Sequence, residues 1–162
     1  MKTLLRTLLY LALIVWLGAE IFFPIVAAVT FTTLIPNTHA AGTIVGHLIR
    51  IMHGTGLVSG VVALGLLALA PAWNIYKPRT VLAPMILVVL MMAFTAFSQY
   101  VIIPAMDRDQ AASGGEIDTN APTNPYTADF NKLHNRSEDV EMTILLLGLG
   151  SVVAVAWAES HR

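Results

Sequence analysis

Residues 134–158 of the chain read HNRSEDVEMTILLLGLGSVVAVAWA, a polar stretch that leads directly into a nearly uncharged apolar run. The apolar part, Met142 to Ala158, has the composition of a helix that enters a lipid bilayer, for which roughly 20 residues are needed. Four polar side chains recur at spacings of three or four residues and would share one face of a helix: His134, Ser137, Glu138 and Glu141. This stretch predicts a transmembrane helix with an ionisable cluster at one end.

The rest of the chain has the composition of a membrane protein as well. Of its 162 residues, 56% are hydrophobic and 12% are charged, whereas a soluble domain carries about 25% charged residues. The sequence therefore predicts an all-α integral membrane four-helix bundle, formed as a single domain over residues 1–162. The expected helices cover about residues 4–35, 39–70, 81–103 and 132–158, and an acidic, irregular loop covers 105–130.

The distribution of charge predicts how the bundle is oriented. Lys2, Arg6, Lys77 and Arg79 fall on one side of this topology, and the acidic loop falls on the other. By the positive-inside rule both termini are cytoplasmic and the loop faces outward, as in a bacterial-type inner (plasma) membrane. The first apolar run is expected to be a retained helix rather than a cleaved signal peptide. The net charge of −1 gives no basic surface for nucleic acid, and the absence of cysteine excludes thiolate sites.

Two prolines are expected to shape the helices. Pro24 should kink the first helix near Glu20, because proline removes one main-chain hydrogen bond and its ring crowds the preceding turn. Pro104 should end the third helix. Counted along each predicted helix at about 1.5 Å per residue, polar side chains then reach one outer level in all four helices. They are Glu20 in the first, His47, Arg50 and His53 in the second, Ser98, Gln99 and Tyr100 in the third, and His134, Ser137, Glu138 and Glu141 in the fourth.

Three interpretations of this outward-facing cluster stay open. Ionisable groups in a membrane tend to be paired, so Glu20 or Glu138 could simply pair with Arg50. Imidazole and carboxylate also suit a divalent transition metal ion, held by His134 and Glu138 with Glu20 and either His53 or His47. As a variant of this cofactor hypothesis, His53 and His134 could be the axial ligands of a haem b. In the third interpretation the cluster, with Gln99, Glu141 and Ser137, lines a pocket or conduit.

Four segments resemble a known family when taken in order: WLGAEIFFPIVAAVTF (16–31), HAAGTIVGHLIRIMH (39–53), QYVIIPAMD (99–107) and FNKLHNRSEDVEMTILLLGL (130–149). Together they are similar to the transmembrane protein 205-like domain of unknown function, a family of small four-helix membrane proteins. The resemblance implies the four-helix topology but no activity. The family-like positions are Trp16, Gly18, Phe23, Pro104, Phe130, His134 and Ser137.

The leading functional hypothesis is a polytopic membrane protein whose His/Glu cluster binds a metal ion or haem. The first alternative is a structural or accessory subunit of a larger membrane assembly, or a homo-oligomer, in which the charges are only paired. The second is a small transporter or a quinone- or porphyrin-linked oxidoreductase. No cofactor-binding or nucleophile motif is present, so the sequence does not predict enzymatic turnover.

Overall fold

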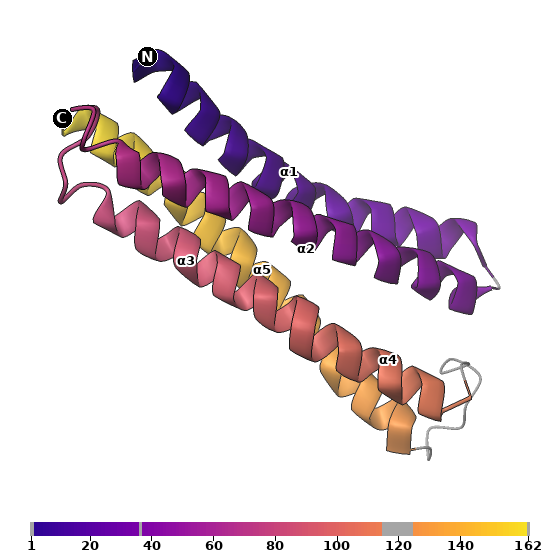
Figure 1. Cartoon of the computed structure of the whole chain (residues 1–162). Helices are drawn as coiled ribbons and strands as arrows, with labels where there is room; N and C mark the ends of the chain where they lie inside the picture. The colour runs from indigo at the N-terminus through magenta and orange to yellow at the C-terminus, as the bar shows by residue number, and fades with distance from the viewer. Residues whose placement is uncertain (1, 36, 115–124, 162) are drawn as a thin grey trace.

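The computed structural model describes residues 2–35, 37–114 and 125–161, and these residues contain no β-strand. They form four long helical segments, two of which are α1 (Lys2–Thr33) and α2 (Thr38–Leu69). The third segment is α3 (Leu82–Phe97), a π-helical turn η1 (Ser98–Ile102) and α4 (Ile103–Ala112) in succession, and the fourth is α5 (Pro125–Ser160). Both chain termini lie at one end of the bundle, called here the termini end; the opposite end is called the loop end (Figure 1).

All four segments are long and apolar enough to cross a membrane. Large apolar side chains such as Ile14, Ile51, Leu146 and Val153 are exposed on the outside of the bundle, where lipid would cover them. The predicted all-α membrane bundle is therefore confirmed. The cytoplasmic placement of the termini stays a prediction.

The predicted end of the third helix at Pro104 is wrong, because the helical segment continues to Ala112. In the π-helical turn the amide of Ile103 donates to the carbonyl of Ser98, five residues earlier. A proline ring clashes with the carbonyl four residues before it and supplies no N–H. Widening the helix by one residue just before Pro104 accommodates both effects, so the helix bulges instead of stopping.

The predicted loop 105–130 is also shorter than expected. Its first residues belong to α4, and its last residues belong to α5, which begins at Pro125 rather than near residue 132. Residues 115–124, between the two helices, lie outside the described residues. By contrast, α1 and α2 begin and end within two residues of the predicted positions.

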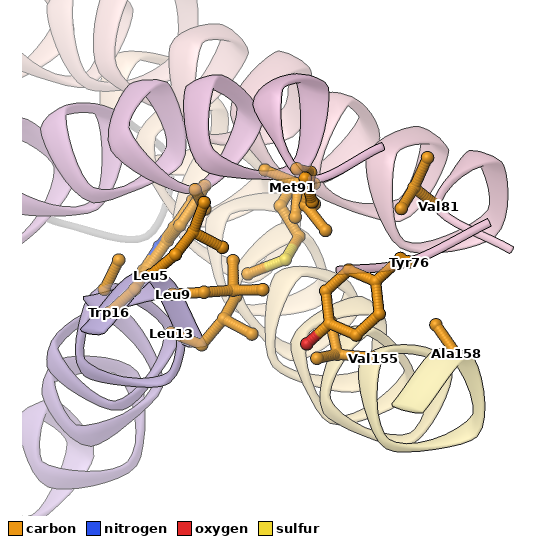
Figure 2. Close-up of a cluster of buried hydrophobic side chains, with 14 of the residues drawn as sticks. Leu5, Leu9, Leu13, Trp16, Tyr76, Val81, Met91, Val155 and Ala158 are labelled. Carbon is orange, nitrogen blue, oxygen red and sulfur yellow. The ribbon is translucent and has the colours of Figure 1, made fainter. Parts of the chain in front are cut away.

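Trp16 packs α1 tightly against α2. Its side chain is fully buried, and its ring lies directly over two glycines of α2, Gly56 and Gly60. A Cβ added at either glycine would come within 2.8 Å of the ring. The small-xxx-small spacing of these glycines therefore makes room for one aromatic side chain. Near it, Leu9 and Leu13 of α1 enter the same apolar core as Met91 and Val155 (Figure 2).

Glu159 ties the helices together at the termini end. It accepts hydrogen bonds from the Tyr10 hydroxyl at 3.2 Å and the Tyr76 hydroxyl at 3.0 Å, and Arg6 Nε lies 3.6 Å from it. Burial and the hydrogen bond to Glu159 raise the pKa of Tyr76 above its usual value, so this hydroxyl remains a donor at neutral pH. One carboxylate thus joins α1, the α2–α3 connection and α5.

The helices diverge toward the loop end. There α1 and α2 stay together as one pair, and α4 and the first part of α5 form a second pair that separates from it (Figure 1). Pro24 lies within the diverging part of α1, where the absence of its N–H leaves the carbonyl of Glu20 without its helical partner. The bundle is therefore closed at one end and open at the other.

Gly56→Ala should destabilise the protein by about 1–3 kcal/mol, because the added methyl group overlaps the Trp16 ring in a packed core. Gly54→Ala on the same helix is the control, because Gly54 is exposed and a Cβ added there meets no atom within 4 Å. Equilibrium unfolding in mixed detergent micelles measures both variants. Equal stability of the two would contradict the Trp16 packing.

Glu159→Ala should lower the free energy of unfolding by roughly 1–3 kcal/mol, since it leaves the partly buried hydroxyls of Tyr10 and Tyr76 without their acceptor. Asp139→Ala removes an exposed carboxylate from the same helix and should change stability by about 0.5 kcal/mol or less. The same unfolding assay compares the two variants. If Glu159→Ala lost no more unfolding free energy than Asp139→Ala, Glu159 would not join the helices at the termini end.

Candidate functional site

The candidate site is organised around His53 of α2, whose side chain is 0% exposed. Its Nδ1 lies 3.0 Å from Oε1 of Gln99, and its Nε2 lies 2.9 Å from Oε1 of Glu141. A neutral imidazole donates from only one nitrogen, so the Gln99 amide, which can present either its oxygen or its NH2, suits both protonation states. The contacts join α2 to η1 and α5 in the middle of the bundle.

The π-helical turn supplies two neighbouring residues to this network. Gln99 contacts His53, and the hydroxyl of Ser98 donates to Oε1 of Glu141 at 2.9 Å. π-Helical turns inside α-helices are frequent at functional sites, where they redirect side chains. Here the turn that accommodates Pro104 also places Gln99 against His53 and Ser98 against Glu141.

Glu20 of α1 completes the arrangement. It is 5% exposed, and its Oε1 accepts a hydrogen bond from Trp16 Nε1 at 3.2 Å. It lies within electrostatic reach of both His53 and Glu141. We call the five residues Glu20, His53, Ser98, Gln99 and Glu141 the polar layer. Every transmembrane segment contributes to it, as the depth count from the sequence predicts.

A cavity of about 1030 Å³ extends from the polar layer toward the loop end, between the two diverging helix pairs, and is called here the cleft. Its apolar lining includes Phe23, Phe31, Ile49, Met106, Phe130 and Leu145. Its ionisable lining includes Glu20, Arg50, Asp107, His134, Glu138 and Glu141. The cleft thus combines apolar walls with two carboxylates from the polar layer.

The predicted pairing of Arg50 with Glu20 or Glu138 is wrong. Arg50 forms a salt bridge with Asp107 and donates to the Gly46 carbonyl at 2.6 Å. Asp107 was expected in an irregular loop, but the continuation of the third segment into α4 brings it opposite α2. The salt bridge therefore joins the two helix pairs across the cleft.

The predicted metal or haem centre is not supported. The described residues contain no group of three or more His, Cys, Asp or Glu side chains that could hold a metal ion. His134 Nε2 and Glu138 Oε1 are 3.4 Å apart, as their spacing suggests, but the two side chains are 53% and 70% exposed. Both ring nitrogens of His53 already have side-chain partners, so neither is free to ligate iron.

The other predicted site residues separate into two groups. Ser137 is buried and lines the cleft, whereas the exposed His47 contacts the Thr43 carbonyl through Nδ1 at 2.7 Å and does not line it. Ser98 lies beside Gln99 as the depth count predicts, whereas sequence reasoning missed Asp107 and the apolar walls.

The family-like positions also divide by role. Phe23 and Phe130 line the cleft, and Phe130 stacks on the His134 ring with centroids 6.3 Å apart. Trp16 lies in the core, and Pro104 follows the π-helical turn. Gly18 borders open space: a Cβ added there would meet no atom within 4 Å.

The model of one protein family, a domain of unknown function named DUF4149, matches residues 11–113. The matched region includes Glu20, His53, Ser98 and Gln99, whereas α5 with Glu141 lies beyond it. No curated protein and no solved structure matches the chain. The match supports a family of unknown function but not the transmembrane protein 205-like name. Because it covers more than half of the 162 residues, the chain belongs to the DUF4149 family.

Proposed function

We propose that this protein binds a lipophilic small molecule inside the membrane, with the polar end of the ligand at the polar layer and its apolar part along the cleft. One observation carries the proposal: a large, mostly apolar cavity ends at buried, hydrogen-bonding side chains. Sites for small molecules are typically about 300–1,000 Å³, apolar in their walls, with a few convergent polar groups. The cleft has this construction.

An unsatisfied oxygen at the base of the cleft supports the proposal. Oε2 of Glu141 is buried and has no hydrogen-bond partner, whereas Oε1 contacts both His53 and Ser98. A buried acceptor without a partner costs about 1–3 kcal/mol or more. A ligand that donates a hydrogen bond to Oε2 would remove this penalty. The unsatisfied oxygen therefore favours the binding of a ligand with a hydrogen-bond donor.

The charges at the two ends support an orientation for the site. Lys2, Arg6 and Lys77 lie at the termini end, and Asp107 lies beside the cleft at the loop end. By the positive-inside rule we place the termini in the cytoplasm and the cleft toward the outer face of a bacterial-type plasma membrane. We take the chain as a single membrane domain, because its long helices share one apolar core.

A cleft-filling substitution tests the proposal, with tritiated dodecanol as the probe and scintillation-proximity binding to protein in nanodiscs as the measurement. Gly42 lines the cleft, and a Cβ there meets no atom within 4 Å, so Gly42→Phe can occupy the cleft without disturbing the fold. Gly42 precedes His53 by eleven residues, roughly 16 Å along α2. We expect saturable binding to the wild-type protein and a loss of about tenfold or more in affinity in Gly42→Phe.

Gly54→Phe is the matched control, because Gly54 lies on the same helix, is exposed, and also borders open space. It should bind dodecanol as the wild-type protein does. Saturable binding that survives equally in both variants would show that the probe binds elsewhere. No saturable binding to the wild-type protein would overturn the proposed function itself.

A further inference from the structure

The charges that line the cleft are unequal in number. Its acidic residues are Glu20, Asp107, Glu138 and Glu141, its one arginine is Arg50, and its two histidines are His39 and His134. Arg50 is already engaged by Asp107 and by the Gly46 carbonyl. The cleft therefore presents more negative than positive charge to a ligand, and its cation is not available to an anionic head group.

The two carboxylates at the base of the cleft have free oxygens. Trp16 uses only Oε1 of Glu20, and among the described residues no side chain donates to its Oε2. Oε2 of Glu141 is buried without a partner. Both residues line the cleft, from α1 and α5. A head group with two or more N–H donors could contact both carboxylates, whereas a hydroxyl group has only one donor.

We infer that the cleft selects a lipophilic ammonium compound, whose N–H groups lie between Glu20 and Glu141 and whose alkyl part follows the apolar walls. This inference rests on the proposed function and adds the charge of the ligand to it. Charges inside a membrane tend to be paired, and a cation beside these carboxylates gains charge-assisted hydrogen bonds. A carboxylate or phosphate head group would instead meet like charge.

The test compares three tritiated probes with the same alkyl chain: dodecylamine, dodecanol and dodecanoate. Scintillation-proximity binding to the full-length protein in phosphatidylcholine nanodiscs at pH 7 should give the order amine, alcohol, carboxylate. We expect dodecylamine to bind at least about tenfold more tightly than dodecanol, as one charge-assisted hydrogen bond would provide. Equal affinities, or tighter binding of dodecanoate, would overturn the inference while dodecanol binding still supported the proposed function.

Two variants locate the selectivity. Glu141→Gln and Glu20→Gln keep the size of each side chain and remove one negative charge. Each should weaken dodecylamine binding by about tenfold to a hundredfold and weaken dodecanol binding by a smaller factor, because the neutral hydroxyl loses part of a hydrogen bond and no charge pairing. Glu20→Gln keeps the inference testable if Glu141→Gln fails to fold, because Glu20 does not contact His53 directly. If both variants bound dodecylamine as the wild type does, the assignment would be wrong.

Asp139→Asn is the matched control for charge. Asp139 lies two residues from Glu141 on α5, is exposed and does not line the cleft, so its loss should leave the order of the probes unchanged. An equal loss of amine selectivity in this variant would contradict recognition by Glu141. Nanodiscs that contain phosphatidylethanolamine distinguish two sources of the ammonium group: competition with dodecylamine indicates a lipid head group, and no competition indicates a single-chain amine.

Discussion

The arrangement of this protein depends on a buried imidazole in an otherwise apolar bundle. His53 has no exposed surface, so both of its ring nitrogens need partners from neighbouring helices. Gln99 and Glu141 provide them at 3.0 and 2.9 Å, and Ser98 supports Glu141. These contacts fix the rotation of η1 and α5 relative to α2. His53 and Ser98 share one oxygen of Glu141, and the other oxygen is left without a hydrogen-bond partner.

The two ends of the bundle differ in how closely their helices pack. At the termini end, Trp16 lies on Gly56 and Gly60, and Glu159 joins three parts of the chain, so this end is closely packed. At the loop end the helix pairs diverge (Figure 1). The salt bridge between Arg50 and Asp107 joins them there, and the cleft lies between the two pairs. The contacts at the termini end hold the four segments together although they separate at the loop end. The cleft is then a property of the fold as a whole rather than of one loop.

Much of this could be predicted from the sequence because hydrophobic length and helical depth are local properties. The number of helices, the approximate bounds of α1 and α2, and the common level of Glu20, His53, Gln99 and Glu141 all follow from residue counts. The partners could not be predicted, since they depend on how each helix rotates about its axis. Arg50 pairs with Asp107 only because Pro104 causes a π-helical bulge instead of ending the helix. The metal hypothesis likewise assumed that His134 and His53 point to one centre, which the described residues do not support.

A double-mutant cycle between His53 and Glu141 measures how strongly their contact stabilises the bundle. The free energies of unfolding of His53→Ala, Glu141→Ala and the double variant, measured in the same micelles, give the coupling between the two side chains. We expect a coupling of about 0.5–3 kcal/mol for these contacting, buried groups. The exposed pair His134 and Glu138 should give only about 0.3–0.5 kcal/mol. Additive effects at His53 and Glu141 would contradict the claim that their contact holds the bundle around the cleft.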